Sequence, residues 1–215
     1  LCGLKNKAMN IVEGVKTLKG RSVEIPDCGR NDIPELLKAH GMKTIAEIGV
    51  YKGEYTEVLA KAGLEVVGID PWDEAVEYPY YNGKSNPQAI EDENYATAKK
   101  RLEGYPNAYL IKRTSMDAVE LCEDESLDAV YIDGNHSFKY VAEDIASWTK
   151  KVKKGGFVCG HDYFYGNKEN FHVRYVVDAY VAAHGIKNLW ILGSKNSKPG
   201  EVRDKWRSWI FQKPE

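Results

Sequence analysis

The sequence lacks both a long hydrophobic run and a surplus of charge of one sign. No window approaches the ~18 apolar residues that a membrane span needs, and residues 1–9 lack the apolar core of a signal peptide. We therefore expect a cytoplasmic protein that does not associate with a membrane. The 30 Lys and Arg residues against 32 Asp and Glu residues leave a net charge of −2. This balance disfavours nucleic acid as a partner, because binding to phosphates needs a basic surplus.

The four cysteines form no CxxC pair. They are scattered along the chain, at Cys2, Cys28, Cys122 and Cys159, which is typical of incidental or buried thiols in a reducing compartment. A composition of 43% hydrophobic and 29% charged residues is ordinary for a globular protein. A chain of this mass buries about 70% of its surface on folding, so we expect one sizeable core.

Strand and helix patterns alternate from residue 31 onward, after an irregular first segment (1–30) that is weakly helical over 10–18. The β-rich runs expected as strands are 44–48, 65–69, 108–111, 127–132, 157–159, 189–192 and 206–211. The expected helices are one after residue 31 or 32 and before Gly41, and 54–62, 88–103, 116–122, 138–152 and 171–183. Such alternation predicts an α/β fold, a doubly wound, mostly parallel sheet. The last two strands have no helix between them, so that pair should be antiparallel.

The turn after the first of these strands carries Glu47, Gly49 and Gly53. Glycines there let the backbone approach a ligand at the carboxyl end of a strand. A site for a pyrophosphate typically has a third glycine and no acid in this turn. The presence of Glu47 therefore favours a ligand whose nearby end carries a positive charge. Asp70 ends the next strand, where a carboxylate can accept from ribose hydroxyls. Trp72 follows it as a ring that could flank a nucleoside.

Two acids and two imidazoles follow the fourth and fifth strands of this series. Asp133 and His136 follow one strand and His161 and Asp162 follow the other. Parallel neighbours end at the same edge of a sheet, so we expect the four side chains to converge. Such a set can bind a divalent metal or transfer protons.

Four segments in this order resemble the class I S-adenosylmethionine-dependent methyltransferases: E-I-G-V-Y-K-G, G-I-D-P-W, Y-I-D-G-N-H-S-F-K-Y-V-A-E-D-I and G-G-F-V-C-G-H-D-Y. The similarity is greatest to the subfamily with a D-G-x-H-x-[YF] motif after the fourth strand and an H-D-Y motif after the fifth. It covers about residues 31–192. It implies a Rossmann-like, seven-stranded sheet with an antiparallel last strand, in a methyltransferase domain of residues 31–215 preceded by an N-terminal extension of residues 1–30.

The resemblance also implies a cofactor site. Glu47, Gly49, Tyr51 and Gly53 would form the turn around the amino-acid end of S-adenosylmethionine, with Tyr51 at the place of a more usual glycine. Asp70 would hold the ribose with Trp72 beside it. Thr114 and Ser115 would lie near the adenine, and Asp133 would border the cofactor.

Metal-dependent O-methyltransferases of the catechol type resemble the same site, which raises metal binding as a second implication. Their ligand positions match Asp133, His161 and Asp162. The imidazole is a departure, because Mg²⁺ prefers oxygen ligands. Either Asp133 and Asp162 alone bind Mg²⁺, or the metal is another divalent ion, or none is used.

The expected activity is that of a transferase that methylates a hydroxyl of a small-molecule acceptor, such as a sugar or natural product. His136 is the first candidate for the general base and His161 the second, with Asp133 and Asp162 orienting the hydroxyl. The alternatives are a nicotinamide-dependent oxidoreductase and a non-catalytic nucleoside-binding module. Residues 1–30 fit a substrate lid or a dimer arm, and the latter would make a homodimer.

Overall fold

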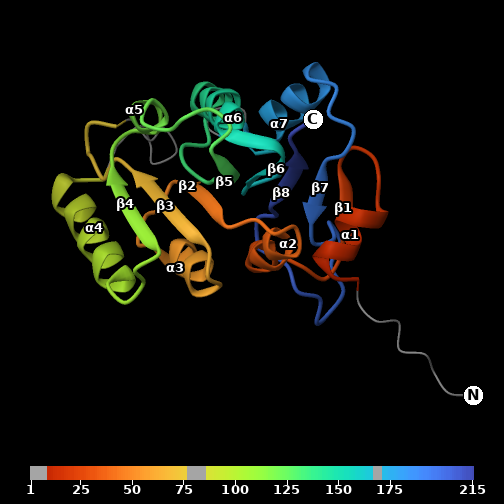
Figure 1. Cartoon of the computed structure of the whole chain (residues 1–215), viewed down its shortest axis with the longest axis horizontal. Coiled ribbons are helices and arrows are strands. Elements are labelled where there is room, and N and C mark those ends of the chain that lie inside the picture. The colour runs from red at the N-terminus through yellow and green to blue at the C-terminus, as the bar shows by residue number, and fades with distance from the viewer. Residues whose placement is uncertain (1–8, 77–85, 167–170) are drawn as a thin grey trace, which may run out of the picture.

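An eight-stranded mixed sheet forms the centre of the computed structural model, which describes residues 9–76, 86–166 and 171–215 (Figure 1). The strands are β1 Val23–Ile25, β2 Thr44–Ile48, β3 Glu65–Asp70, β4 Ala108–Lys112, β5 Leu127–Ile132, β6 Val152–Gly160, β7 Trp190–Leu192 and β8 Trp209–Gln212. Their order across the sheet is β1-β7-β8-β6-β5-β2-β3-β4. Only β8 runs antiparallel to its neighbours, β6 and β7. The expected doubly wound α/β fold with an antiparallel last strand is confirmed.

Strand β1 is the element that the sequence did not predict, and it makes the sheet eight-stranded rather than seven-stranded. It pairs in parallel with β7, from Val23 opposite Trp190 to Ile25 opposite Leu192. Three residues are too short a run to show an alternating pattern. Helix α1 (Ile11–Thr17), capped by Asn10, buries Ile11 in the same core as β1. Residues 10–25 are therefore part of the packed fold.

Helices cover both faces of the sheet, as a mostly parallel sheet requires. The remaining ones are a short 3-10 turn, η1 Arg30–Asp32, and the α-helices α2 Ile33–Ala39, α3 Glu54–Lys61, α4 Gln88–Leu102, α5 Ser115–Val119, α6 Phe138–Lys151 and α7 Val173–Ala183. Successive residues of β5 point to opposite faces of the sheet. Val130 packs in the hydrophobic cluster that includes α6 and α7, and Tyr131 packs in the cluster that includes α1, α2 and α3. Figure 1 shows α5, α6 and α7 along the upper side and α2 and α3 below.

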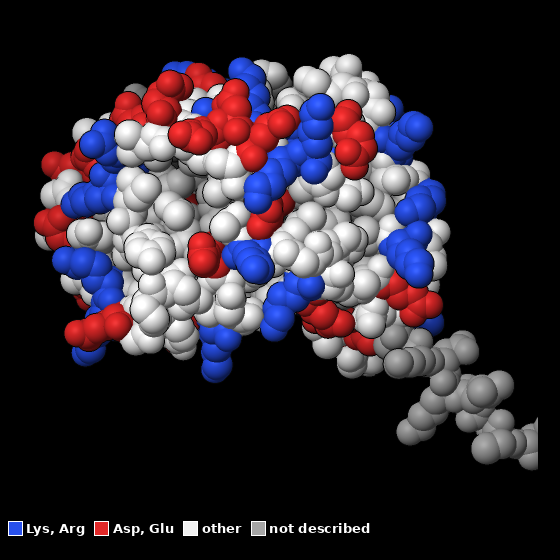
Figure 2. Space-filling view, viewed as in Figure 1, with Lys and Arg blue, Asp and Glu red and all other residues white. Residues whose placement is uncertain are grey.

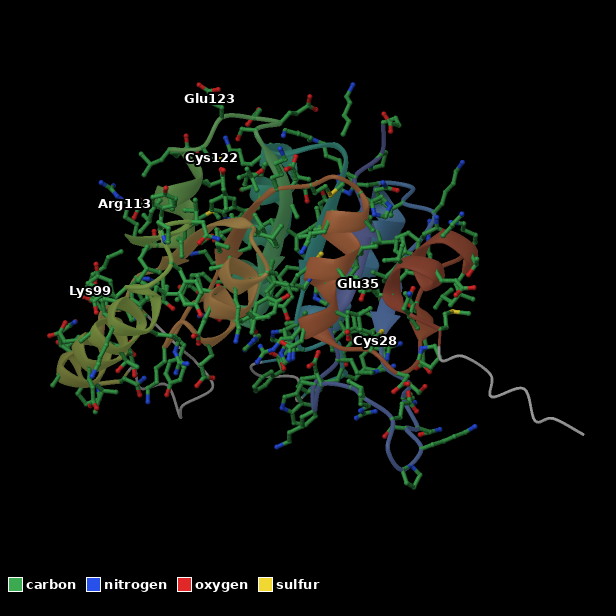
Figure 3. The ribbon with its side chains drawn as sticks, turned by 60° about the horizontal axis from the view of Figure 1, so that its bottom comes forward. Cys28, Glu35, Lys99, Arg113, Cys122 and Glu123 are labelled. Carbon is green, nitrogen blue, oxygen red and sulfur yellow. The ribbon has the colours of Figure 1, made fainter. Side chains whose placement is uncertain are left out.

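The cysteines in the described parts of the chain form no disulfide with one another, as their scattered positions led us to expect. Cys28, Cys122 and Cys159 are all free, and Cys28 and Cys122 lie far apart (Figure 3). Burial raises the pKa of the Cys28 thiol to about 12, which makes it unreactive. In the same described ranges, no helix is long and apolar enough to cross a membrane.

The carboxyl ends of four parallel strands meet at the middle of one sheet edge. Ile48 at the end of β2 lies opposite Ile69 of β3 and Ile132 of β5, and Ile132 lies opposite Gly160 of β6. The direction of strand succession reverses at β2, which is where open α/β sheets bind ligands. The segments that follow these four strands form the site.

Candidate active site

The turn after β2 has a left-handed backbone at three positions. The φ angles are +89° at Gly49, +55° at Tyr51 and +77° at Gly53. A Cβ on Gly49 would lie 2.2 Å from the carbonyl oxygen of Asp133, so only glycine fits there. Tyr51 adopts a conformation that costs a non-glycine residue ~1–2 kcal/mol, and its side chain is exposed. The turn is thus shaped by its backbone, as the sequence suggested.

Asp70 holds this turn against the end of β3. One carboxylate oxygen accepts from the backbone N–H groups of Val50 and Tyr51, each at 2.9 Å, and the other accepts from the N–H of Trp72 at 3.0 Å. Burial raises the pKa of Asp70, and the three backbone bonds oppose that shift. Asp70 therefore orders the turn and also borders the cavity beside it.

A cavity of about 300 Å³ opens between the turn and the end of β5. Its wall consists of Arg30, Glu47, Gly49, Val50, Tyr51, Lys52, Glu54, Tyr55, Asp70, Asn86, Glu91, Asp133, Gly134 and His136. Sites for small ligands and cofactors have volumes of this order or larger. Of the predicted cofactor residues the described wall includes Glu47, Gly49, Tyr51, Asp70 and Asp133.

The other four predicted cofactor residues do not line this cavity. Trp72 is 1% exposed; its ring packs on Tyr95 at 4.6 Å and its Nε1 donates to the carbonyl of Tyr51. Thr114 caps α5, where its hydroxyl accepts from the N–H of Asp117. Ser115 donates to Asp144 and accepts from the indole of Trp148. The side chains of Trp72, Thr114 and Ser115 thus pack in the core or form local hydrogen bonds and do not face the cavity. Gly53, also absent from the wall, begins α3 and packs near Ala98.

Glu47 is a buried acid at the base of the cavity. It accepts a hydrogen bond from the hydroxyl of Thr56. Burial raises the pKa of Glu47 to about 8; the bond from Thr56 and the charge of Arg30 lower it, and Asp133 raises it. The carboxyl group is poised to ionise when a cationic group enters the cavity.

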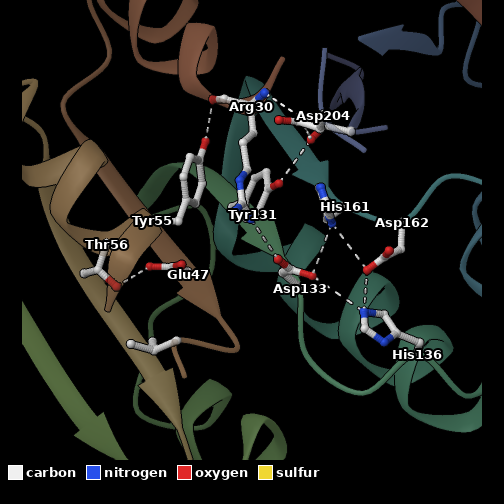
Figure 4. Close-up of polar contacts among 12 residues, drawn as sticks. Arg30, Glu47, Tyr55, Thr56, Tyr131, Asp133, His136, His161, Asp162 and Asp204 are labelled. Carbon is white, nitrogen blue, oxygen red and sulfur yellow. Dashed lines mark hydrogen bonds and ion pairs between the residues drawn. The ribbon is translucent and has the colours of Figure 1, made fainter. Parts of the chain in front are cut away.

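The four predicted rim residues do converge (Figure 4). His136 Nε2 lies 2.7 Å from one oxygen of Asp162 and 3.5 Å from one oxygen of Asp133. His161 Nδ1 lies 3.3 Å from the same oxygen of Asp162 and 3.8 Å from Asp133. Two carboxylates thus alternate with two imidazoles at the ends of β5 and β6. Only Asp133 and His136 of the four also line the cavity.

These contacts shift the ionisation of the rim. Burial lowers the pKa of His136, but hydrogen bonds with Asp133 and Asp162 outweigh it and raise the value to about 9. The pKa of His161 is also raised, because its bond with Asp162 and the nearby charges overcome burial. Burial would raise the pKa of Asp162, but its bonds to the two imidazoles lower it. Asp162 is therefore a carboxylate that accepts hydrogen bonds from two imidazole groups, of which His136, with a pKa of about 9, is imidazolium at neutral pH.

Asp133, His136 and Asp162 also fit a divalent cation. One ligand atom from each lies within 4.8 Å of the others. The set contains Asp133 and Asp162, the pair expected from the sequence, and has His136 in the place where the resemblance put His161. A mixed oxygen and nitrogen donor set suits Mn²⁺, Fe²⁺ or Zn²⁺ better than Mg²⁺.

Arg30 is a site residue that the sequence did not predict. Its Nη1 lies 3.3 Å from an oxygen of Asp133, although 103 residues separate the two in the chain. A single arginine in a segment without a clear pattern gives no signal of this contact. Two further wall residues were not predicted: Asn86, just before α4, and Glu91, in its first turn.

Residues 46–163 match a family model described as a methyltransferase domain. A search of curated proteins gives no match. Among solved structures, an O-methyltransferase from Bacillus cereus in complex with SAH superposes with a TM-score of 0.59 at 16% identity, covering 86% of this chain and 80% of that one. An O-methyltransferase from Thermotoga maritima gives 0.59 at 14% identity, covering 95% and 71%. An rRNA methylase from Streptococcus thermophilus gives 0.55 at 14% identity, covering 81% and 88%. At these identities the structural likeness shows the fold.

Proposed function

The chain belongs to this methyltransferase domain family and is a class I S-adenosylmethionine-dependent methyltransferase, and we propose that it methylates a hydroxyl oxygen of a small-molecule acceptor such as a sugar or natural product. The observation that carries the proposal is the cluster of Asp133, His136, His161 and Asp162 beside the cavity. The sulfonium methyl is already activated, so the protein must orient an acceptor and remove its proton. A hydroxyl needs that proton removed, and this cluster is built from proton-transfer groups.

S-adenosylmethionine fits the cavity through its two polar ends. Asp70 still has acceptor capacity after its three backbone bonds, because each carboxylate oxygen accepts about two hydrogen bonds, and it can take the ribose hydroxyls. Gly49 allows the backbone to approach the ligand, and Glu47 offers a buried carboxyl group to the cationic amino-acid end. In this arrangement the methyl group points to the rim, where Asp133 and His136 border the cavity.

In the proposed reaction an oxygen lone pair of the acceptor forms the new O–C bond while the C–S bond of the cofactor breaks. The electron pair of that bond would stay on sulfur, and the hydroxyl proton would pass to His136 in its neutral form, a form whose share grows as the pH rises toward the raised pKa of about 9. Asp133 and Asp162 stabilise the imidazolium that forms, since they already raise the pKa of His136.

A metal-assisted variant rests on the same residues. Asp133, His136 and Asp162 would hold the divalent cation, which would act as a Lewis acid on the acceptor oxygen. His161, 3.3 Å from Asp162, is then the imidazole left to take the proton. Asp133 and Asp162 have the same orienting role in both variants.

Calorimetry and a labelled-methyl assay test the proposal. S-adenosylhomocysteine should bind the EDTA-treated protein saturably, and repeating the titration with Mg²⁺ or Mn²⁺ separates the two variants. Labelled S-adenosylmethionine should transfer its methyl group to members of a panel of glycosides and phenols and not to total tRNA or rRNA. Labelling of RNA alone would contradict the acceptor class, and a folded protein without cofactor binding would contradict the whole proposal.

The charge distribution supports a small acceptor over RNA. Figure 2 shows acidic and basic side chains interspersed on one face, without a continuous basic area. Apart from Glu47, whose raised pKa keeps it mostly protonated at neutral pH, the cavity wall carries four acids, Glu54, Asp70, Glu91 and Asp133, beside Arg30 and Lys52. Such a wall repels a phosphate backbone.

A further inference from the structure

Arg30 is a preorganised cation in the cavity wall. Its backbone N–H donates to Asp204 at 2.7 Å, and its carbonyl accepts from the hydroxyl of Tyr55 at 2.9 Å. The guanidinium lies over the ring of Tyr55, with its central carbon 5.2 Å from the ring centre. Figure 4 shows the side chain extending from the segment before α2 toward Asp133. Both the backbone and the side chain are thus fixed before any ligand arrives.

The contact of Arg30 with Asp133 uses one nitrogen of the guanidinium. It is a single hydrogen bond of 3.3 Å, whereas a guanidinium offers five N–H donors and binds a carboxylate best through two parallel bonds. Asp133 has further cationic partners in His136 and His161. Arg30 is therefore suited to a second anion in the cavity.

The wall offers few places for an anion. Of the cations in its described wall, His136 is paired with Asp162 at 2.7 Å, and Lys52 belongs to the turn after β2, where its ammonium lies over the ring of Tyr51, 5.1 Å from the ring centre. Arg30 lies next to Asp133 and interacts electrostatically with buried Glu47. Asp70 is at the end of β3. These charges match a ligand that places hydroxyl groups at Asp70 and a zwitterionic end, with one ammonium and one carboxylate, at Glu47 and Arg30.

We propose that Arg30 binds the carboxylate of the amino-acid end of S-adenosylmethionine, opposite Glu47, which faces the ammonium group. The inference rests on the proposed binding of this cofactor in the cavity. It makes Arg30, from outside the matched family segment of residues 46–163, a determinant of cofactor affinity. A guanidinium–carboxylate pair in a partly closed site contributes about 10- to 100-fold in affinity.

A ligand-truncation cycle tests the inference by calorimetry. S-adenosylhomocysteine, its decarboxylated analogue and methylthioadenosine are titrated into the wild type and Arg30→Ala. The wild type should bind S-adenosylhomocysteine about 10- to 100-fold more tightly than the decarboxylated analogue. Arg30→Ala should bind these two almost equally, and its affinity for methylthioadenosine should be unchanged.

Control variants separate this role from a structural one. Arg101→Ala is matched, because Arg101 is also 31% exposed and its guanidinium pairs with carboxylates, those of Glu57 at 3.0 Å and Glu54 at 3.6 Å; it should keep the wild-type preference. Arg30→Lys should keep part of the preference for S-adenosylhomocysteine over its decarboxylated analogue. A preference for the carboxylate that persists in Arg30→Ala would overturn the inference, and so would an equal loss for all three ligands. Failure of the wild type to bind any of the ligands would instead overturn the proposed cofactor, and the inference with it.

Discussion

The turn after β2 and the rim at the ends of β5 and β6 border the same cavity but are built differently. The turn owes its shape to backbone: left-handed residues at Gly49, Tyr51 and Gly53, and backbone N–H groups bonded to Asp70. The rim owes its shape to side chains, with carboxylates and imidazoles 2.7–3.8 Å apart. A binding site that is shaped by the backbone tolerates few substitutions, because they alter its shape. A site that is formed by side chains can lose or change its chemistry through one substitution while the backbone around it stays the same.

That difference predicts that substitutions at the rim remove turnover and leave cofactor binding intact. His136→Ala should lower kcat about 10²- to 10⁴-fold, because it removes the group that accepts the acceptor proton. The dissociation constant for S-adenosylhomocysteine should stay within about twofold. Steady-state kinetics on the acceptor identified by the labelled-methyl assay and calorimetry on the same preparation give both values.

His184→Ala is the matched control for this prediction. His184 ends α7, exposed, with its Nδ1 2.9 Å from the carbonyl of Tyr180. It should leave both kcat and cofactor affinity unchanged. If His136→Ala instead loses the cofactor, the rim is part of the binding site and the contrast between the two regions fails.

Substitutions in the turn should show the opposite pattern. Gly49→Ala should lower the free energy of unfolding by about 2–5 kcal/mol, the sum of a left-handed alanine and an overlap with the backbone of Asp133. Cofactor binding should be lost with it. Gly63→Ala separates the two terms, because Gly63 has almost the same φ, +88°, and nothing within 4 Å of its Cβ position.

Urea unfolding of the two glycine variants measures the difference. Gly63→Ala should lose only ~1–2 kcal/mol and keep its cofactor affinity. Equal losses in both variants would mean that the close approach to Asp133 contributes nothing.

Glu47 connects the two regions, and its ionisation makes stability depend on pH. Burial raises the pKa of Glu47 to about 8, above the ordinary value of about 4.3. Between these values the folded protein keeps a proton that the unfolded chain has released, so the free energy of unfolding falls as pH rises. Glu47→Gln removes this pH dependence, so its stability relative to the wild type should rise by on the order of 3–4 kcal/mol between pH 5 and pH 8, since the folded state keeps close to one extra proton over most of this range and each pH unit is then worth about 1.4 kcal/mol.

Urea unfolding at the two pH values checks this gain. Glu54→Gln is the control, because Glu54 also lines the cavity but is exposed, and its stability should follow that of the wild type at both pH values. A Glu47→Gln variant that shows no gain would mean that Glu47 is ionised in the folded protein at pH 5.

The fold could be predicted from the sequence wherever a pattern is long or capped. Asn10 caps α1, Pro34 lies in the first turn of α2, and α6 follows the amphipathic stripe of 138–152. Strand β1 could not be predicted, because its partner is β7 and its three residues carry no period of their own.

The rim could be predicted because parallel strands end at one edge, so residues after β5 and β6 must meet. Arg30 could not, because its contact with Asp133 depends on how the segment before α2 folds back over the sheet. The orientations of Trp72, Thr114 and Ser115 could not be predicted either. Each follows a strand, as the cofactor residues do, but core packing and local hydrogen bonds decide where the side chain points.

The smallest predicted effect tests that last point at the end of β4. Ser115→Ala should leave the affinity for S-adenosylhomocysteine within about twofold, because the hydroxyl bonds Asp144 and Trp148 rather than lining the cavity. The free energy of unfolding should fall by about 1–2 kcal/mol, since buried Asp144 loses its donor. Thr114→Ala, which removes the cap of α5, should likewise cost about 1 kcal/mol in stability with no change in affinity. A tenfold loss of cofactor affinity in Ser115→Ala would place the end of β4 against the adenine after all, and the cavity would then extend past Asp70 once the cofactor is bound.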